Sequence, residues 1–287
     1  MNDQQTQTIR KLSHILLPTD GSEFSAGAER IGIAMAAKSG SKLEILRIVL
    51  QGTELGQLGA GTNTRQAEEA LAQLEGVKER AIAAGVDCTL SVRTATDPYQ
   101  AIVDAARDTG TDLIVMGRRG RRGLARLMLG DATAKVMGYS PCAVMVVPEA
   151  SEMWSGVLLA SDGSRSSDAA ATMAARLAQC CNVAVDVLSV KVPSHSERRQ
   201  AETGPIVDRT VANLKALGIE ANSIVEEGMA DDVILSVAER RGDNLIILGS
   251  HGRTGIGRVL FGSKAERVIN GSKCPVLVAK SETEKSD

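Results

Sequence analysis

The chain has 287 residues, of which 43% are hydrophobic and 24% charged, with a net charge of −2; this length suits two globular domains of ordinary size. The near-neutral charge removes any global electrostatic case for binding nucleic acid or an anionic membrane. Aromatic residues make up only 2%, which argues against a stacking platform for single-stranded nucleic acid and predicts a core of Ala, Val, Ile and Leu.

Predicted strands and helices alternate along the first half of the chain. An apolar run begins at His14 and leads into a turn at Asp20, and Asp97 and Pro98 supply an N-cap acceptor and a favourable first residue for a later helix. The other predicted elements are strands over 43–49, 89–93, 113–116 and 143–147, and helices over 25–38, 65–84 and 131–138. This alternation predicts a parallel sheet with helical crossovers, an α/β layered fold.

Three stretches of the first half lack helical or strand periodicity. Residues 1–11 are polar and predict a loose tail. Residues 51–64 are rich in Gly and Thr and predict a mobile loop, and residues 117–130 predict a second loop, between a strand and a helix.

The second half of the chain repeats the first. Residues 15–22 (ILLPTDGS) match residues 157–164 (VLLASDGS), an offset of 142. Residues 113–117 (LIVMG) match residues 245–249 (LIILG), an offset of 132. One domain is therefore present twice, with ten residues fewer in the second copy.

The missing ten residues fall most simply in the loop after the second strand of the repeat. That strand, 43–49 in the first copy and Val185–Lys191 in the second, keeps the offset of 142. The predicted loops that follow are 51–64 and 193–205, and residues 148–155 form the linker between the copies.

A glycine pattern follows the fourth strand of the second copy. Gly249 ends the apolar run, Gly252 follows three residues on, and Gly262 precedes Ser263 at the start of a helical segment. Glycines without a Cβ let a ligand lie close to the main chain, and a helix N-terminus offers N–H groups and a favourable dipole to an anion. This combination suits a triphosphate; the structural alternative is a set of tight turns that need positive φ angles.

The pattern Gly-x2-Gly-x9-Gly-Ser, placed after a strand and before a helix, resembles the nucleotide-binding signature of the universal stress protein family. Both halves resemble a domain of that family in element order, over residues 12–148 and 155–280, as in its tandem members. The resemblance implies two Rossmann-like, doubly wound parallel sheets of five strands in the order 3-2-1-4-5. Ligands bind such sheets at the carboxyl ends of the strands, beside the point where the strand order reverses.

The resemblance implies an ATP site in the second copy. It assigns Asp162 to the ribose or adenine end, the backbone of Val190 to adenine, and the glycine pattern to the phosphates, through Gly249, Gly252, Gly262 and Ser263. Each residue also has a plain structural interpretation: Asp162 as a turn residue, Val190 as core, and Ser263 as a helix N-cap. Arg253 and Arg258 lie within the loop and are expected to be solvated, with contacts to phosphate oxygens as the alternative. His251 is expected to be a loop residue without a catalytic partner.

The first copy keeps Asp20, Gly117, Gly120 and Gly130 but carries Asp131 where the family has Ser or Thr. A carboxylate at a helix N-terminus is favourable by about 0.3–1 kcal/mol without a ligand, yet it repels a phosphate. We therefore expect a weaker or absent first site, which a bridging Mg²⁺ could rescue because Mg²⁺ prefers carboxylate and phosphate oxygens.

Other chemistry finds no support in the sequence. The basic block of residues 118–122 is expected to be a solvated loop, with a polyanion patch as the alternative. The five cysteines are odd in number and contain no Cys-x-x-Cys, and no P-loop, nucleophile elbow or zinc-protease motif occurs. We expect a cytoplasmic protein without a long apolar segment.

The sequence thus predicts a stress-response protein that binds ATP, with Mg²⁺, for regulation. It is not expected to be an enzyme, beyond slow ATP hydrolysis at most, because no general base is evident. A scaffold that binds another ligand or an unknown protein partner, and holds no nucleotide, is the competing class; an adenylyl-transferring enzyme is a third.

The last strand of each copy, 143–147 and Val276–Ala279, is apolar and lies at a sheet edge in the implied strand order. An uncovered apolar edge promotes aggregation, and single-domain relatives are implied to cover theirs by dimerising. We expect the two copies to pair as an intrachain pseudo-dimer about a pseudo-twofold axis, with a homodimer as the alternative. A linker of about eight residues reaches at most roughly 28 Å, enough for adjacent copies.

Residues 1–150 expressed alone should therefore dimerise or precipitate, and Met145→Lys should loosen the two copies in the full chain. Sedimentation at micromolar concentration checks the first expectation. A well-behaved monomer of the isolated half would rule this arrangement out.

Overall fold

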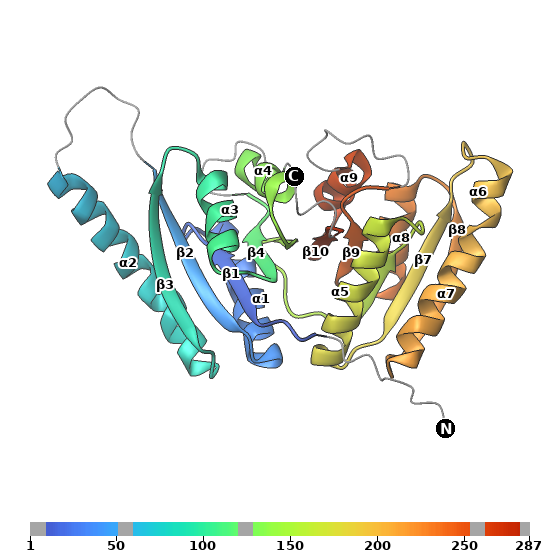
Figure 1. Ribbon diagram of the computed structural model, residues 1–287, viewed down its shortest axis with the longest axis horizontal. Helices are drawn as coiled ribbons and strands as arrows, with labels where there is room; N and C mark the ends of the chain where they lie inside the picture. The colour runs from blue at the N-terminus through green and yellow to red at the C-terminus, as the bar shows by residue number, and fades with distance from the viewer. Residues whose placement is uncertain (1–9, 51–59, 120–128, 253–261, 282–287) are drawn as a thin grey trace. The chain divides into compact units, whose positions relative to one another are not determined.

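The computed structural model describes residues 10–50, 60–119, 129–252 and 262–281, with side chains of α2 described from residue 68. The chain divides into two compact units, an N-terminal one over Leu12–Met153 and a C-terminal one that starts at Trp154 (Figure 1). The two units contain the two copies of the sequence repeat.

The N-terminal unit has a parallel five-stranded sheet in the order β3-β2-β1-β4-β5. Its elements are β1 (His14–Pro18), α1 (Ala26–Ser39), β2 (Lys42–Leu50), α2 (Ala60–Ala83), β3 (Cys88–Ala95), α3 (Pro98–Asp108), β4 (Leu113–Gly117), α4 (Asp131–Tyr139) and β5 (Ala143–Val147). A short 3₁₀ turn, Glu23–Ser25, precedes α1.

The C-terminal unit repeats this topology, with the order β8-β7-β6-β9-β10. Its elements are β6 (Val157–Ala160), α5 (Arg165–Cys181), β7 (Val185–Lys191), α6 (Glu197–Ala201), α7 (Thr203–Ala216), β8 (Ala221–Glu227), α8 (Ala230–Arg241), β9 (Ile246–Gly249), α9 (Ser263–Gly271) and β10 (Val276–Ala279). The predicted fold class and strand order are confirmed in both units. β5 and β10 lie at sheet ends within their units, and pairing between the copies stays a prediction.

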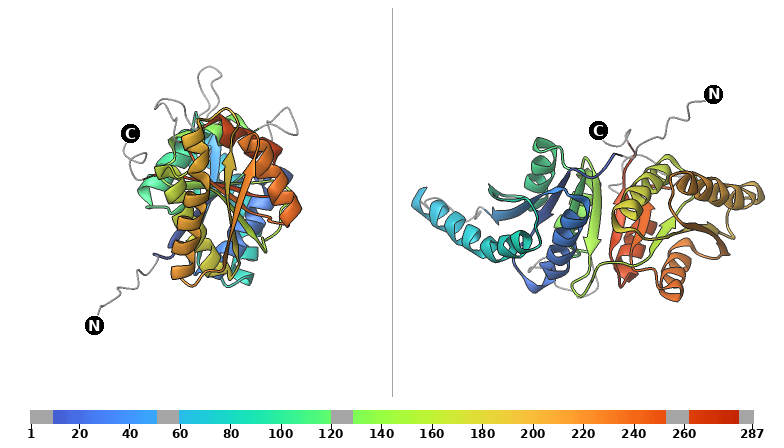
Figure 2. Two further views of the ribbon diagram at one scale, coloured as in Figure 1. Left: turned by 90° about the vertical axis from the view of Figure 1, so that its right-hand side faces the viewer. Right: turned by 90° about the horizontal axis from the view of Figure 1, so that it is seen from below.

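Helices cover both faces of each sheet, which explains why the central strands are apolar on both sides. In the C-terminal unit α5 and α7 pack on one face, and α8 packs beside α9 on the other (Figure 2). The centre of β1 is fully buried, at Ile15, Leu16 and Leu17. Helix α1 packs closely on it: a Cβ added at Gly32 would lie only 3.3 Å from the Leu17 side chain. The core is aliphatic, as the low aromatic content predicts.

The predicted mobile loop over 51–64 is wrong at its end, because α2 begins at Ala60; residues 51–59 lie outside the described residues. Extending an existing helix adds a hydrogen bond for each residue ordered, and this offsets the low helix propensity of the Gly and Thr there. The predicted loop over 193–205 is also wrong, since α6 and the first turn of α7 lie in it.

The strand registers locate the shortening of the second copy. Leu43 pairs with Cys88, 45 residues on, whereas the equivalent Val185 pairs with Ala221, 36 residues on. Nine of the ten missing residues therefore fall between the second and third strands of the repeat. The segment α6–α7 replaces a longer connection at this place.

Helix capping differs from prediction at Asp97. It is the N-cap of α3 and Pro98 is the first helical residue, but the Asp97 side chain accepts no capping hydrogen bond. The fixed φ of Pro98 therefore favours the start of α3 without help from the carboxylate.

A buried acidic cluster lies at the amino-terminal edge of the C-terminal sheet. Asp186 of β7 accepts hydrogen bonds from Arg241 Nε at 2.5 Å and Asn222 Nδ2 at 2.8 Å. Asp243 has a buried Oδ2 without a hydrogen-bond donor among the described residues. Burial raises the pKa of Asp243 to about 6; the Asp186 carboxylate adds to the rise and Arg241 opposes it.

Asp243→Asn should therefore stabilise the C-terminal unit at pH 7.5. Asp243 keeps its proton up to a higher pH in the folded state than in the unfolded state. Its contribution to the free energy of unfolding therefore falls as pH rises from about 4 to 6. We expect a gain of about 1–2 kcal/mol, less than the roughly 3 kcal/mol of the full pKa difference because the side chain is partly solvated.

The gain should shrink as pH is lowered from 6 to 4. Urea unfolding followed by the fluorescence of Trp154, the single tryptophan of the chain, reports on this unit. Asp208→Asn, on the exposed face of α7, is the control. Equal urea midpoints at pH 7.5 would show that the Asp243 charge costs nothing.

Candidate functional site

The strand order of the C-terminal unit reverses between β6 and β9, and a cavity of about 450 Å³ opens at their carboxyl ends. Connections diverge to opposite faces at this point, which leaves a crevice. All six residues predicted for this site line the cavity: Asp162, Val190, Gly249, Gly252, Gly262 and Ser263. The structure brings them together from the turn after β6, from β7, from β9 and the loop that follows it, and from the start of α9.

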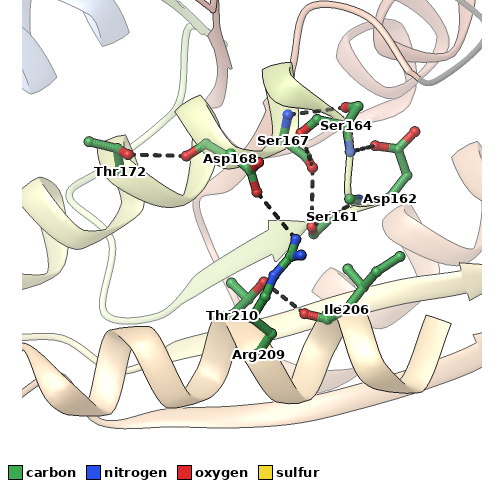
Figure 3. A network of polar contacts seen from close by, with 10 residues as sticks. Ser161, Asp162, Ser164, Ser167, Asp168, Thr172, Ile206, Arg209 and Thr210 are labelled. Carbon is green, nitrogen blue, oxygen red and sulfur yellow. Dashed lines mark hydrogen bonds and ion pairs between the residues drawn. The ribbon is translucent and has the colours of Figure 1, made fainter. Parts of the chain in front are cut away.

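The turn after β6 holds Asp162 at the cavity (Figure 3). Its Oδ1 accepts the N–H of Ser164 at 3.0 Å, and Ser164 Oγ caps α5 by accepting the N–H of Ser167 at 3.2 Å. Oδ2 lies 3.9 Å from Arg199 Nη2. Asp162 therefore has the turn role and also presents a carboxylate oxygen at the cavity.

None of the three glycines has a positive φ angle, and Gly249 is the most crowded of them. A Cβ at Gly249 would lie 2.6 Å from the Ser166 carbonyl carbon, so the strand end must be glycine for α5 to pack there. The tight-turn alternative is therefore wrong for these positions.

Gly252 and Gly262 are crowded by other groups. A Cβ at Gly252 would lie 3.0 Å from Asp162 Oδ2, and one at Gly262 would lie 3.2 Å from the Ser250 carbonyl oxygen. The Gly262 N–H donates to that same oxygen at 2.9 Å, which closes the loop. Residues 253–261, with Arg253 and Arg258, lie outside the described residues.

Gly262 is the N-cap of α9, and Ser263 is the first helical residue, so the predicted capping role of Ser263 is wrong by one position. The helix begins one residue earlier than predicted, and Gly262 has the extended dihedral angles of an N-cap residue. Ser263, Lys264 and Ala265 line the cavity. Their backbone N–H groups belong to the first helical turn, which has no acceptors within the helix.

Most of the charged and polar lining residues that were not predicted come from the segment 193–205, which was predicted to be a loop. His195, Arg199, Gln200 and Thr203 line the cavity from α6 and its flanks, and Lys264 lines it from α9. Ser196 accepts the Arg199 N–H at 3.4 Å as an N-cap, and a Ser followed by a short polar run was the available signal.

His195 lies in a cationic environment. Burial lowers its pKa, the charges of Arg199 and Lys264 lower it further, and Asp162 acts in the opposite direction. An apolar part of the wall is lined by Leu188, Val192, Ile206, Ile234, Leu248 and Val268, and Ser161, Ser164, Ser167, Ser189, Ser250 and His251 line the cavity as well. The cavity thus combines an apolar region, one carboxylate and a cluster of cations.

The equivalent crevice of the N-terminal unit has the same backbone contacts. Asp20 accepts hydrogen bonds from Ser22 and Ser25. A Cβ at Gly117 would lie 2.7 Å from the Phe24 carbonyl oxygen, and one at Gly130 would lie 3.2 Å from Arg119 Cα. Gly120 lies outside the described residues.

The Arg47 side chain distinguishes this first crevice from the second. Arg47 of β2 is equivalent to Ser189 of β7. The preceding residues show this equivalence, because Leu46 O accepts the Thr19 N–H and Leu188 O accepts the Ser161 N–H in the same way. A Cβ at Gly21 would lie 4.0 Å from Arg47 Nη1, so the guanidinium reaches the turn after β1.

The basic block and Asp131 have local partners. The Arg119 guanidinium lies 4.0 Å above the Phe24 ring, so this residue packs on the protein rather than standing in solvent as predicted. Residues 120–122 are not described. Asp131, the first residue of α4, pairs with Lys135 at 2.8 Å, and this pairing reduces the charge it would present to a phosphate.

Within the described ranges, no group of three His, Cys, Asp or Glu side chains is arranged to hold a metal ion. A search of the same residues finds no helix long and apolar enough to cross a membrane.

Known proteins resemble the chain over nearly its whole length. A universal stress protein of Synechocystis is 23% identical over 93% of this chain and 99% of that protein. A universal stress protein of Methanocaldococcus jannaschii is 43% identical over a shorter match, 22% of this chain and 37% of that protein.

A crystal structure of a universal stress protein from Archaeoglobus fulgidus shares the fold, with a TM-score of 0.75 at 24% identity over 93% of this chain and 98% of that one. The model of the universal stress protein family matches twice, over residues 11–148 and 153–280. The chain therefore belongs to the universal stress protein family, as a tandem member with one family domain in each half.

Proposed function

We propose that the C-terminal unit binds ATP in the crevice between β6 and β9 and that this binding is regulatory. The observation that carries the proposal is one cavity of about 450 Å³ that joins an apolar region, the Asp162 carboxylate and the N-terminus of α9. These three environments suit a purine base, a ribose and a phosphate chain. The volume lies within the range of small-molecule sites.

Each part of ATP has a partner of suitable chemistry in this cavity. The apolar wall and the end of β7 at Val190 suit adenine, and Asp162 Oδ2 can accept from a ribose hydroxyl. The N–H groups and the dipole at Ser263 suit a phosphate. Mg²⁺ would bind through phosphate oxygens and water, as it commonly does with nucleotides.

The proposed role is regulatory because the polar groups suit binding better than catalysis. Asp162 Oδ1 is engaged in the turn, and His195 has two cations near it, Arg199 and Lys264. Such groups neutralise phosphate charge, whereas hydrolysis also needs a positioned base and water. We expect slow ATP hydrolysis at most.

A scaffold that binds an apolar metabolite is the second candidate, and the six aliphatic residues of the wall favour it. It would leave Asp162 and the cations unused. Mass spectrometry of ligand released from the purified protein distinguishes the two candidates.

The N-terminal crevice is proposed to bind ATP weakly or not at all. Asp131 places a carboxylate at the start of α4, although Lys135 pairs with it. Arg47 places a guanidinium at the turn where the C-terminal unit has the small, buried Ser189. We propose that the larger Arg47 side chain occupies space that a nucleotide would need, an obstacle that Mg²⁺ would not relieve.

Gly252→Val should weaken ATP binding at least tenfold without unfolding the protein. The added side chain would meet Asp162 Oδ2, 3.0 Å from its Cβ, and would narrow the approach to the phosphates. Calorimetry with Mg²⁺ and ATP measures the affinity. Gly76→Val is the control, since a Cβ there meets nothing within 4 Å; unchanged affinity in Gly252→Val would reject the phosphate assignment.

The double variant Arg47→Ser/Asp131→Ser should raise the ATP stoichiometry from about one towards two per chain. Each single variant should gain less, because the other obstacle remains. Equilibrium dialysis at saturating ATP gives the stoichiometry. A wild-type protein that already binds two, or a double variant that still binds one, contradicts the account of the first crevice.

A further inference from the structure

We propose that α6 makes the C-terminal crevice selective for a phosphorylated ligand: Arg199 contacts the phosphate chain and leaves Asp162 when a nucleotide binds. This inference rests on the proposed nucleotide site and adds a specificity-determining residue to it. The residue lies outside the glycine pattern and comes from the segment that differs between the two copies of the repeat.

Local hydrogen bonds fix the segment that carries Arg199. The His195 N–H donates to the Val192 carbonyl oxygen at 2.9 Å, and Gln200 Nε2 donates to the His195 carbonyl oxygen at 2.8 Å. Ser196 Oγ accepts the backbone N–H of Arg199 at 3.4 Å. The backbone of Arg199 is therefore ordered by residues 192–200, and its side chain lines the cavity.

The contact between Arg199 and Asp162 is one that a phosphate can replace. Nη2 and Oδ2 are 3.9 Å apart, longer than a hydrogen bond, and both side chains are partly exposed, at 24% and 38%. Such partly solvated ion pairs contribute little. A guanidinium binds a phosphate through two parallel hydrogen bonds, which are stronger.

The exchange favours a charged ligand over a neutral one. When Arg199 turns to a phosphate, Asp162 keeps its bond from the Ser164 N–H and gains a ribose hydroxyl donor. A nucleoside without phosphate offers Arg199 no partner, so the contact with Asp162 persists. Arg199 should therefore contribute to the affinity for ATP and not to that for adenosine.

The surrounding charges suit several negative charges on the ligand. Burial and the charges of Arg199 and Lys264 lower the pKa of His195, and the Asp162 carboxylate acts in the opposite direction. Lys264 lies beside Ser263 in the first turn of α9, where the dipole also favours an anion. His195, Arg199 and Lys264 thus line the same cavity, together with His251.

The test compares Arg199→Gln with Arg198→Gln for ATP and for adenosine, by calorimetry on the full chain at fixed ionic strength. Arg198 is a matched control, because it precedes Arg199 on the same helix, is 92% exposed and pairs with Glu202. Arg199→Gln should weaken ATP binding roughly tenfold or more and change adenosine binding less than about twofold. Arg198→Gln should resemble the wild type for both.

A second measurement detects the proton that His195 takes up when ATP binds. A phosphate near this imidazole would raise its pKa from the lowered value of the free protein, so the complex binds more protons. ATP affinity should therefore rise as pH falls from 7.5 to 6, and more in the wild type than in His195→Gln. The comparison cancels the titration of ATP itself.

Each outcome decides between the two proposals. If the wild type binds neither ATP nor adenosine, the nucleotide site itself is wrong. If the wild type binds both and Arg199→Gln weakens both equally, or neither, Arg199 does not read the phosphate although the nucleotide site stands. Identical pH dependence in His195→Gln and the wild type would place the phosphates away from α6 and also overturn the inference.

Discussion

The crevice depends on one constraint, the close approach of the helical segment after the first strand of each unit to the end of the fourth strand; this segment is the 3₁₀ turn before α1 in the N-terminal unit and the start of α5 in the C-terminal unit. At Gly249 a Cβ would lie 2.6 Å from the Ser166 carbonyl carbon, and at Gly117 it would lie 2.7 Å from the Phe24 carbonyl oxygen. Only glycine permits this packing without a backbone shift. The packing holds the turn after the first strand beside the loop after the fourth, and this places Asp162 opposite Gly252.

The same scaffold carries different chemistry in the two units. In the C-terminal unit the small Ser166 packs against Gly249, the small Ser189 lines the cavity, and that cavity opens beside Asp162. In the N-terminal unit the equivalent positions carry Phe24 and Arg47, and Arg119 lies on the Phe24 ring. Both units keep the glycines, so those glycines report the packing of the fold, and the residues around them decide what the crevice can hold.

Charge in the C-terminal crevice is divided between two sides. Asp162 is the carboxylate of the turn after β6, while Arg199 and Lys264 approach from α6 and α9. Burial and both cations disfavour the protonated form of His195 and so lower its pKa. Such a division suits a ligand with a hydroxyl-bearing middle and an anionic end, and Arg199 of α6 supplies one of the cations.

Most strands and helices could be predicted from the sequence, because strand and helix periodicity and the repeat offsets of 142 and 132 are local signals. The glycine spacing and the family resemblance also identified six of the residues that line one cavity, but α6 and its contribution to that cavity were missed. The sequence could not show that Gly249 serves helix packing, that Arg47 reaches the turn at Gly21, or that Arg199 meets Asp162, since these contacts join residues 26 to 83 positions apart. Tertiary structure decided them, because side chains from separate strands and helices meet only after the sheet has ordered them, and the space left between them sets what can bind.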